Sequence, residues 1–365
     1  MDVHADGLIH GLKSVRPAWK ITEHCPQRPN LSGWLKPLES LSKYTERYWH
    51  YPNRLKQIDA DILHIIDHSD GYLCDRLRRN QQLNVVTCHD LINLIQPETF
   101  RGRAIFPWLS MTLWQQAVQS MKQANHVITV SAHTKQDTVE HLGISPKDIT
   151  VIHNAVNNGF RPLNPEHNRA VRERYSLANG TFCLLNVGSN NARKNISAIL
   201  SVIDRLKSQE LPVVFWKAGA DFDLSQKQFI QTRGLGSVVR YLGKPTEETL
   251  VELYNAADCL IAPSLYEGFG FTILEAMACG TPVITANVSA MPEVAGDAAL
   301  LVDPNDIEVI ARAVQDLHTH PEKAKALVRK GLTRVQNFSW ENTAEQAAQV
   351  YEQVLAQSTN HMSKS

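Results

Sequence analysis

Two carboxylates, Glu267 and Glu275, stand eight residues apart in the segment PSLYEGFGFTILEAMACGTPVI. Gly268 and Gly270 punctuate a turn between them, and FTILEAMACG then has the apolar spacing of a helix. A glycine loop that opens into a helix directs backbone N–H groups and the positive helix end toward an anion. Carboxylates beside a phosphate would repel it, so we expect each to accept hydrogen bonds from hydroxyl groups, as on a sugar and a ribose. The alternative is that both are solvated surface residues.

Two adjacent cations offer a second kind of ligand chemistry. Arg193 and Lys194 lie in the polar loop GSNNARKN, which follows the apolar run TFCLLNV. The loop has neither the G-x-G-x-x-G pattern nor a P-loop, which disfavours an NAD-dependent oxidoreductase or an ATP-binding protein. Arginine as a planar fork and lysine as a point charge would neutralise a diphosphate. A solvated basic loop is the alternative interpretation.

The carboxylates are predicted to lie at one edge of a parallel sheet. DCLIAPS (258–264) is typical of a buried strand, and TPVITA (281–286) is typical of the next strand after the helix. A strand, loop, helix and strand in this order form one unit of a parallel sheet. Open sheets of this kind bind ligands in a crevice at the carboxyl ends of their strands. We therefore expect Glu267 and Glu275 to approach one crevice.

Polar side chains also follow two earlier strands, ILHII (62–66) and NVVTC (84–88). The first strand runs into Asp67, His68 and Asp70, and the second runs into His89 and Asp90. Strands of one parallel sheet bring such groups to the same edge. A metal site at this edge is disfavoured, because the histidines lack the spacing of a helix-borne metal pair.

The sequence PSLYEGFGFTILE resembles the E-x7-E signature of the family-4 retaining glycosyltransferases (glycosyl transferases group 1), which have the GT-B fold. The segments EAMACGTPVI and MPEVAGDAALLVDP look like the continuation of that pattern, and a weaker resemblance extends from about residue 60 to the end. The resemblance implies an α/β protein with two Rossmann-like parallel-sheet domains that face each other across a cleft. It also implies transfer of a hexosyl group from a nucleotide diphosphate sugar to an acceptor hydroxyl, with retained anomeric configuration.

The resemblance assigns roles residue by residue. VTCHD matches a family phrase whose histidine lies beside the donor sugar, and RKN matches the cations that stabilise the departing diphosphate. The implied catalytic residues are His89, Arg193, Lys194 and Glu267. The implied donor-binding residues are Gly188, Arg193, Lys194, Tyr241, Gly243, Glu267, Gly268, Phe269, Gly270, Phe271 and Glu275. On the acceptor side, His68, Asp70 and Asp90 are candidates. No metal and no other cofactor is expected, and a phosphate oxygen of the donor is expected to take the acceptor proton.

One departure from the family concerns the start of the chain. A hydrophobic strand and a glycine loop should come first, yet the sequence begins with residues 5–14, which have the spacing of an amphipathic helix. The first strand of the N-terminal domain is therefore apparently missing. The predicted organisation is 1–160 as the N-terminal acceptor-side domain, 161–338 as the nucleotide-sugar domain, 339–357 as a helix returning to the first domain, and 358–365 as a disordered tail.

Composition limits the other classes of function. Lysine and arginine together number 37, as do aspartate and glutamate. The chain therefore has no net positive charge that would favour binding to nucleic acid. Six scattered cysteines without C-x-x-C predict reduced thiols. No apolar run has the length of a membrane span and no signal peptide is recognised, which predicts a cytoplasmic protein.

Several further elements are predicted with alternatives. WKITEH (19–24) is expected to form a short strand, and 149–156 another. The aromatic segment 43–56 favours an amphipathic helix packing its rings, with contact to an acceptor or a membrane as the alternative. Residues 103–124 favour a helix packed on the sheet through Phe106, Trp108, Leu109, Leu113 and Trp114. Shallow insertion into a membrane interface is the alternative, because many family members use lipid-linked acceptors.

The expected pathway is the synthesis of a polysaccharide, glycolipid or glycoconjugate, with a nucleotide sugar and a sugar or lipid-linked acceptor as partners. Two alternatives remain open. A sugar-nucleotide epimerase shares the GT-B architecture but leaves no transferred glycoside. A non-catalytic nucleotide-sugar-binding protein is the other alternative, which applies if the first strand is truly absent.

Overall fold

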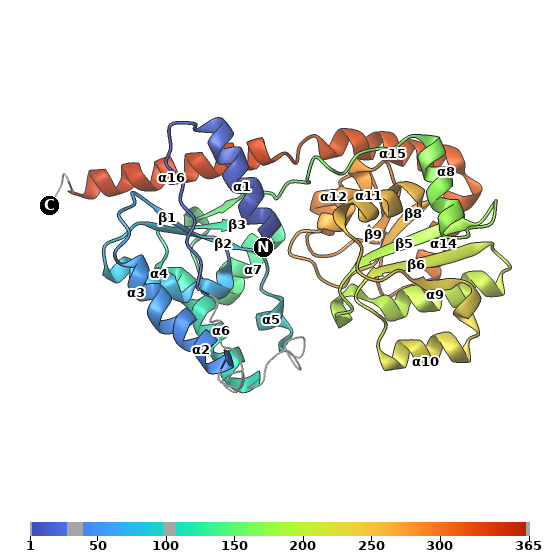
Figure 1. Cartoon of the computed structure of the whole chain (residues 1–365), viewed down its shortest axis with the longest axis horizontal. Coiled ribbons are helices and arrows are strands. Elements are labelled where there is room, and N and C mark those ends of the chain that lie inside the picture. The colour runs from blue at the N-terminus through green and yellow to red at the C-terminus, as the bar shows by residue number, and fades with distance from the viewer. Residues whose placement is uncertain (1, 28–38, 98–106, 363–365) are drawn as a thin grey trace.

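Short runs of aliphatic residues form two separate parallel sheets in the computed structural model, which describes residues 2–27, 39–97 and 107–362. The two α/β domains lie side by side (Figure 1). The first sheet has the order β1-β2-β3-β4. Its strands are β1 (Leu63–Ile65), β2 (Asn84–Cys88), β3 (His126–Thr129) and β4 (Ile149–Val151).

The second sheet is larger and has the order β10-β9-β8-β5-β6-β7. Its central strand β5 pairs in parallel with β6 on one side and β8 on the other, so Leu184 lies opposite both Phe215 and Cys259. The strand order reverses between β5 and β8, and the loops after these two strands therefore flank a crevice where ligands bind in open sheets. The strands are β5 (Phe182–Gly188), β6 (Val213–Gly219), β7 (Val239–Tyr241), β8 (Cys259–Ala262), β9 (Val283–Ala286) and β10 (Leu300–Val302).

Helices cover both sheets. Those of the first domain among the described residues are α1 (Asp2–Val15), α2 (Glu39–Thr45), α3 (Tyr51–Leu55), α4 (Tyr72–Arg79), α5 (Ile92–Ile95), α6 (Pro107–Ser120) and α7 (Ala132–Leu142). The later helices are α8 (Pro165–Arg174), α9 (Ile196–Ser208), α10 (Leu224–Thr232), α11 (Glu247–Ala256), α12 (Phe271–Ala278), α13 (Met291–Ala295), α14 (Ile307–Thr319), α15 (Pro321–Val335) and α16 (Trp340–Met362).

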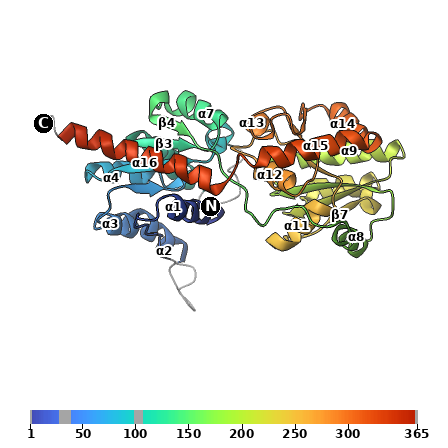
Figure 2. The ribbon, with the colours of Figure 1, turned by 90° about the horizontal axis from the view of Figure 1, so that it is seen from above.

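The last helix, α16, extends from the second domain across the first and packs against α1 (Figures 1 and 2). Close approach requires glycine on α1, because a Cβ on Gly7 would lie 2.2 Å from the Trp340 ring and one on Gly11 would lie 2.4 Å from the Trp340 carbonyl. Leu8 and Leu12 join the alanines of α16 in one apolar cluster. Helix α1 is the first element of the described chain, and no described strand precedes Leu63.

The structure corrects three sequence predictions. Residues 19–24 form no strand, since Trp19 and Ile21 pack against the α16 cluster and the segment pairs with no sheet. The strand predicted over 149–156 ends at Val151. Helix α16 continues to Met362, into the segment predicted as a disordered tail.

Two aromatic segments are largely structural. Residues 39–55 form α2, a π-helical turn and α3, in which the Tyr48 ring packs on those of Tyr44 and Tyr72 while Trp49 stays 66% exposed. In α6, Trp114 is buried in the core under the first sheet. The start of the predicted helix, 103–106 with Phe106, lies outside the described residues. Among the described residues, no helix is long and apolar enough to cross a membrane.

Candidate active site

Glu267 is held by both predicted cations. Its Oε2 accepts a hydrogen bond from Arg193 Nη1 at 2.5 Å, and its Oε1 pairs with Lys194 Nζ at 2.7 Å. The residue is 8% exposed, and this burial alone would raise the pKa of the carboxyl, but Lys194 and Arg193 outweigh it and lower the pKa. Glu267 is therefore an ionised carboxylate shared between two cations.

Two loops of distant sequence are fixed together at this point. Residues 192–194 form a 3-10 turn whose cap, Asn191, accepts from Arg193 N at 3.2 Å. Asn195 has a left-handed backbone (φ 57°) and donates its side-chain amide to the Pro263 carbonyl at 3.1 Å. Leu265 N donates to the Arg193 carbonyl at 2.7 Å. The loop after β5 is thereby tied to the loop after β8, which carries Glu267.

Glu275 lies inside α12 and faces a buried tyrosine. Tyr254, fully buried on α11, donates its hydroxyl to Glu275 Oε2 at 2.7 Å. Burial raises the pKa of Glu275, while the hydrogen bond from Tyr254 and the charge of Lys194 oppose only part of that effect. The charge of Lys194 acts to lower the pKa of both carboxylates, although Lys194 forms an ion pair only with Glu267 among the described residues. Tyr254 was not predicted from the sequence, where it is one more residue on the apolar face of a helix.

The Glu267 loop also touches the first domain. The Gly268 carbonyl accepts hydrogen bonds from Ser131 Oγ at 2.8 Å and Thr134 Oγ1 at 3.2 Å, at the start of α7. A Cβ on Gly268 would lie 1.9 Å from the backbone oxygen of His89. Only glycine permits this approach, so the loop that carries the acid is positioned by both domains.

A second set of contacts joins the domains around α7. The Tyr266 hydroxyl donates to Asp137 Oδ2 at 2.6 Å, which with burial raises the pKa of Tyr266 and keeps it a donor. Ala132 N donates to both carboxylate oxygens of Glu293, and His153 Nε2 lies 2.6 Å from that carboxylate. These residues escaped sequence reasoning because their partners are more than a hundred positions away.

His89 and Asp90 face the second domain from the end of β2. His89 Nε2 lies 2.8 Å from the Ile66 carbonyl, which can only accept, so Nε2 carries the proton. Burial, with the neighbouring His68, lowers the pKa of His89 and favours the neutral ring, whose Nδ1 is then an acceptor. Burial lowers the pKa of Arg193, but the negative charges of Glu267 and Asp90 raise it by more, so the net shift is upward. Asp90 thus acts on Arg193 and the His89 backbone lies against the Glu267 loop, while the His89 ring packs within the first domain, 4.9 Å from that of His4.

The remaining acceptor-side candidates are engaged within the first domain. His68 is buried, and its Nδ1 accepts from the His89 backbone N–H at 3.3 Å. Asp70 pairs with Arg47 at 2.6 Å, and burial raises its pKa although Arg47 opposes this. Among the described residues, no hydrogen bond joins either side chain to the second domain.

Several donor-side candidates gather at the ends of β5, β6 and β7. Gly188 (φ 130°) and Gly219 (φ 104°) approach so closely that a Cβ on Gly219 would lie 2.3 Å from the Gly188 carbonyl. Gly219 N donates to the Gly243 carbonyl at 2.7 Å, and the Tyr241 hydroxyl donates to the Gly219 carbonyl at 2.9 Å. Tyr241 keeps 41% of its surface exposed beside these turns.

The two phenylalanines of the glycine loop have a different place. Phe269 is 4% exposed and its ring lies 5.4 Å from that of Phe271 and 6.1 Å from that of Phe338. Gly270 (φ 117°) precedes the first turn of α12. The Phe269 side chain therefore packs toward the segment that leads into α16, which leaves only its backbone for contact with a donor.

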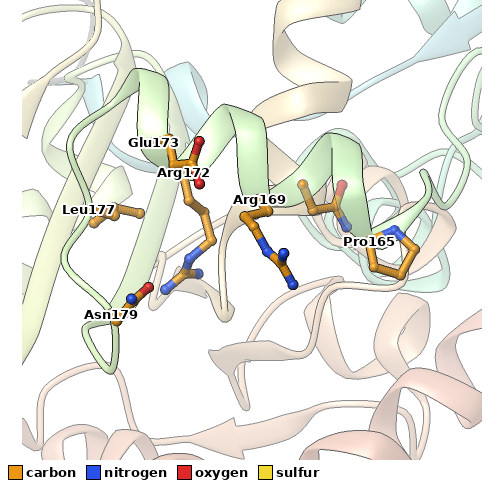
Figure 3. Close-up of a pocket in the computed structure, with 7 residues that line it drawn as sticks. Pro165, Arg169, Arg172, Glu173, Leu177 and Asn179 are labelled. Atoms are coloured by element: carbon orange, nitrogen blue, oxygen red, sulfur yellow. The ribbon is translucent and has the colours of Figure 1, made fainter.

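A cavity of about 330 Å³ lies elsewhere, along α8 (Figure 3). Arg172 in its wall is already engaged, since it donates to Asp258 and to the Ala256 and Thr181 carbonyls. None of the candidate site residues lines this cavity. Its lining residues are Pro165, Asn168, Arg169, Arg172, Glu173, Leu177 and Asn179. No group of three potential metal-ligating side chains occurs in the described part of the chain.

Comparisons with known proteins identify the family of the chain. Residues 18–159 match the family Glycosyltransferase Family 4, and residues 168–334 match Glycosyl transferases group 1. The O-antigen chain mannosyltransferase B of Escherichia coli is 32% identical over 306 residues, which cover 82% of this chain and 77% of that protein.

Solved structures show the same architecture. Sucrose-phosphate synthase from Thermosynechococcus elongatus has a TM-score of 0.74 at 23% identity, covering 97% of this chain and 93% of its own. Anabaena HepE, solved with UDP and glucose, has a TM-score of 0.72 at 19% identity, covering 89% of this chain and 84% of its own. The fold is thus GT-B, as expected from the sequence. The chain belongs to the group-1, family-4 glycosyltransferases and is a glycosyltransferase.

Proposed function

We propose that the enzyme transfers a hexosyl group, specifically a mannosyl group, from a nucleoside diphosphate sugar to an acceptor hydroxyl with retained anomeric configuration. The observation that supports it most is Glu267 shared between Arg193 and Lys194 beside His89. The similarity to an O-antigen mannosyltransferase favours mannose and a polysaccharide pathway. The acceptor is a sugar or a lipid-linked sugar at the first domain, where exposed Trp49 favours contact with a membrane surface.

The proposed transfer depends on stabilising the negative charge of the leaving diphosphate. The bond between the anomeric carbon and the diphosphate oxygen breaks, and the acceptor oxygen bonds to that carbon on the same face. Negative charge develops on the departing diphosphate, where Arg193, Lys194 and the N-terminus of α12 stabilise it. The acceptor proton passes to a phosphate oxygen of the leaving group. Because the protein's own cations supply the positive charge, we propose that no metal or other cofactor takes part.

The ion pairs of Glu267 give the donor a way to bind. A diphosphate that reaches Arg193 and Lys194 replaces the carboxylate as their counter-ion, and Glu267 is freed to accept hydrogen bonds from sugar hydroxyls. Glu275, oriented by Tyr254 through one oxygen, accepts from the ribose through the other. The two carboxylates therefore bind and position the donor.

The two carboxylates should respond differently to substitution. Glu275→Gln should weaken nucleoside diphosphate affinity by roughly tenfold, because a hydrogen bond to a charged acceptor is lost. Glu267→Gln should leave that affinity unchanged or tighter, since the cations lose their internal counter-ion, while transfer falls about 100-fold. Calorimetric titration measures the first effect and product formation the second. Equal nucleotide affinity in both variants would contradict the division of roles.

Product analysis tests the reaction itself. Wild-type protein is incubated with GDP-mannose, UDP-glucose or ADP-glucose and a panel of sugar and lipid-linked sugar acceptors. We expect a new glycoside whose anomeric configuration, read by NMR, equals that of the donor. Release of an epimerised sugar without any glycoside would instead support the epimerase, and donor binding without product would support a binding protein.

A further inference from the structure

Lys217 is a buried lysine that the mechanism above does not use. It lies on β6 within the apolar run VVFWKAG and has no exposed surface. Its Nζ donates to the Gly188 carbonyl at 2.8 Å and to the Ala218 carbonyl at 2.9 Å. Among the described residues, no carboxylate forms an ion pair with it. A buried ammonium without a counter-ion is costly, so an anion bound nearby would stabilise its charged form.

The surroundings of Lys217 concentrate positive charge at one turn. Gly188 lies between two lysines. Lys217 Nζ donates to the Gly188 carbonyl, and a Cβ added to Gly188 would lie 3.5 Å from Lys194 Cε. The charged groups that face Lys217 are Lys194 from the loop after β5 and Asp221 from the loop after β6. Asp221 is already paired with Lys227 at 2.6 Å.

The carboxylate near Lys194 does not balance this charge either. Glu267 is shared between Arg193 and Lys194, which leaves the charge of Lys217 uncompensated. Lys194 and Lys217 thus both lie at the Gly188 turn, and Arg193 joins Lys194 on the shared carboxylate of Glu267. This arrangement fits a ligand with two negative charges, which a nucleoside diphosphate sugar carries on its two phosphates.

We propose that Lys217 is a positioning residue of the diphosphate site: held beneath the Gly188 turn, it fixes that turn and adds a third positive charge to the field that binds the diphosphate. The inference rests on the proposed function. Lys217 does not contact the ligand in this account, because its hydrogen bonds go to the two carbonyls.

This role makes donor binding depend on pH. Burial, with a smaller effect of Lys194, lowers the pKa of Lys217 to about 8. The positive charge is therefore present below pH 8 and lost as the pH rises above it. A bound diphosphate stabilises the charged form and raises the pKa of Lys217, so binding near pH 8 draws a proton from solution.

The test is calorimetric titration of the wild-type protein at pH 8 in buffers of different ionisation enthalpy. The probes are GDP-mannose, UDP-glucose and ADP-glucose, whose phosphates do not titrate in this range. We expect uptake of about half a proton, and an affinity that falls roughly tenfold between pH 7 and pH 9. Lys217→Met should show no uptake, a flat pH profile and an affinity about tenfold weaker at pH 7.

Two variants assign the proton to Lys217. Lys217→Arg keeps the charge at every pH and should bind without proton uptake. Absence of uptake in the wild type, or the same uptake and pH profile in Lys217→Met, would overturn the role of Lys217 while leaving the proposed function intact. If no nucleotide sugar binds the wild type at any pH, the proposed function itself fails, and this inference with it.

Discussion

Replacing Lys194 by alanine should lower turnover about 100-fold or more, with the folded state retained. The reason is electrostatic: Lys194 Nζ is one of two cations on Glu267, and in the proposed donor complex it faces the departing diphosphate. Removing one such contact from a closed site typically costs roughly 2.7–4 kcal/mol of transition-state stabilisation. Initial rates of glycoside formation at saturating donor measure the effect.

The matched control is Lys325→Ala. Lys325 pairs with Glu322 on the surface of α15, where both side chains are more than half exposed. Exposed pairs of this kind contribute little, so turnover and thermal stability should both stay near wild type. Unchanged turnover in Lys194→Ala, with the control also unchanged, would remove Lys194 from the mechanism.

Replacing Gly268 by alanine should abolish most transfer while sparing nucleotide binding. The added Cβ would meet the His89 backbone oxygen at 1.9 Å, and backbone on both sides leaves no flexible side chain to yield. The two domains must therefore move apart where the Glu267 loop meets His89, at the proposed junction of donor and acceptor. A displacement of about 1 Å in a site of this kind can cost about 100-fold in rate. Nucleoside diphosphate affinity should change by less than about twofold, because the proposed nucleotide contacts all come from the second domain.

Gly236→Ala is the control for Gly268→Ala. A Cβ on Gly236 meets nothing within 4 Å and its backbone is not left-handed. Its rate and nucleotide affinity should equal those of the wild type. A Gly268→Ala enzyme with wild-type transfer would show that the contact between the Glu267 loop and His89 is not needed for catalysis.

Individual strands, turns and helices were predicted well, because the spacing of apolar residues and the position of glycines within each segment determine them. The strand, glycine turn and helix around Glu267 follow apolar spacing, and the strand predicted over 84–88 forms β2 with the same bounds. The prediction of a strand over WKITEH was wrong. Its spacing is typical of a strand, but a strand also needs a neighbouring strand to pair with, and the structure provides none for this segment. Trp19 instead packs beside Tyr351 of α16, far along the chain.

The details of the site depend on contacts that spacing cannot reveal. Nothing local indicates that Asn195 bonds the Pro263 carbonyl, which brings the cations onto Glu267. Phe269 lies in the same sequence motif as Glu267, yet its ring packs against Phe338 and not toward the Glu267 site. Lys217 did carry a signal, a charged residue inside a strand of aliphatic and aromatic residues, and this signal went unused.

Arg193 and Lys194 are proposed to bind the diphosphate of the donor. This role is tested by comparing calorimetric affinities for GDP, UDP and ADP with those for the corresponding monophosphates, in the wild type and in an Arg193→Ala/Lys194→Ala double variant. We predict that the preferred diphosphate binds the wild type at least about tenfold tighter than its monophosphate, and that the double variant loses this difference. A preference for the diphosphate that survives in the double variant would show that groups other than Arg193 and Lys194 bind it.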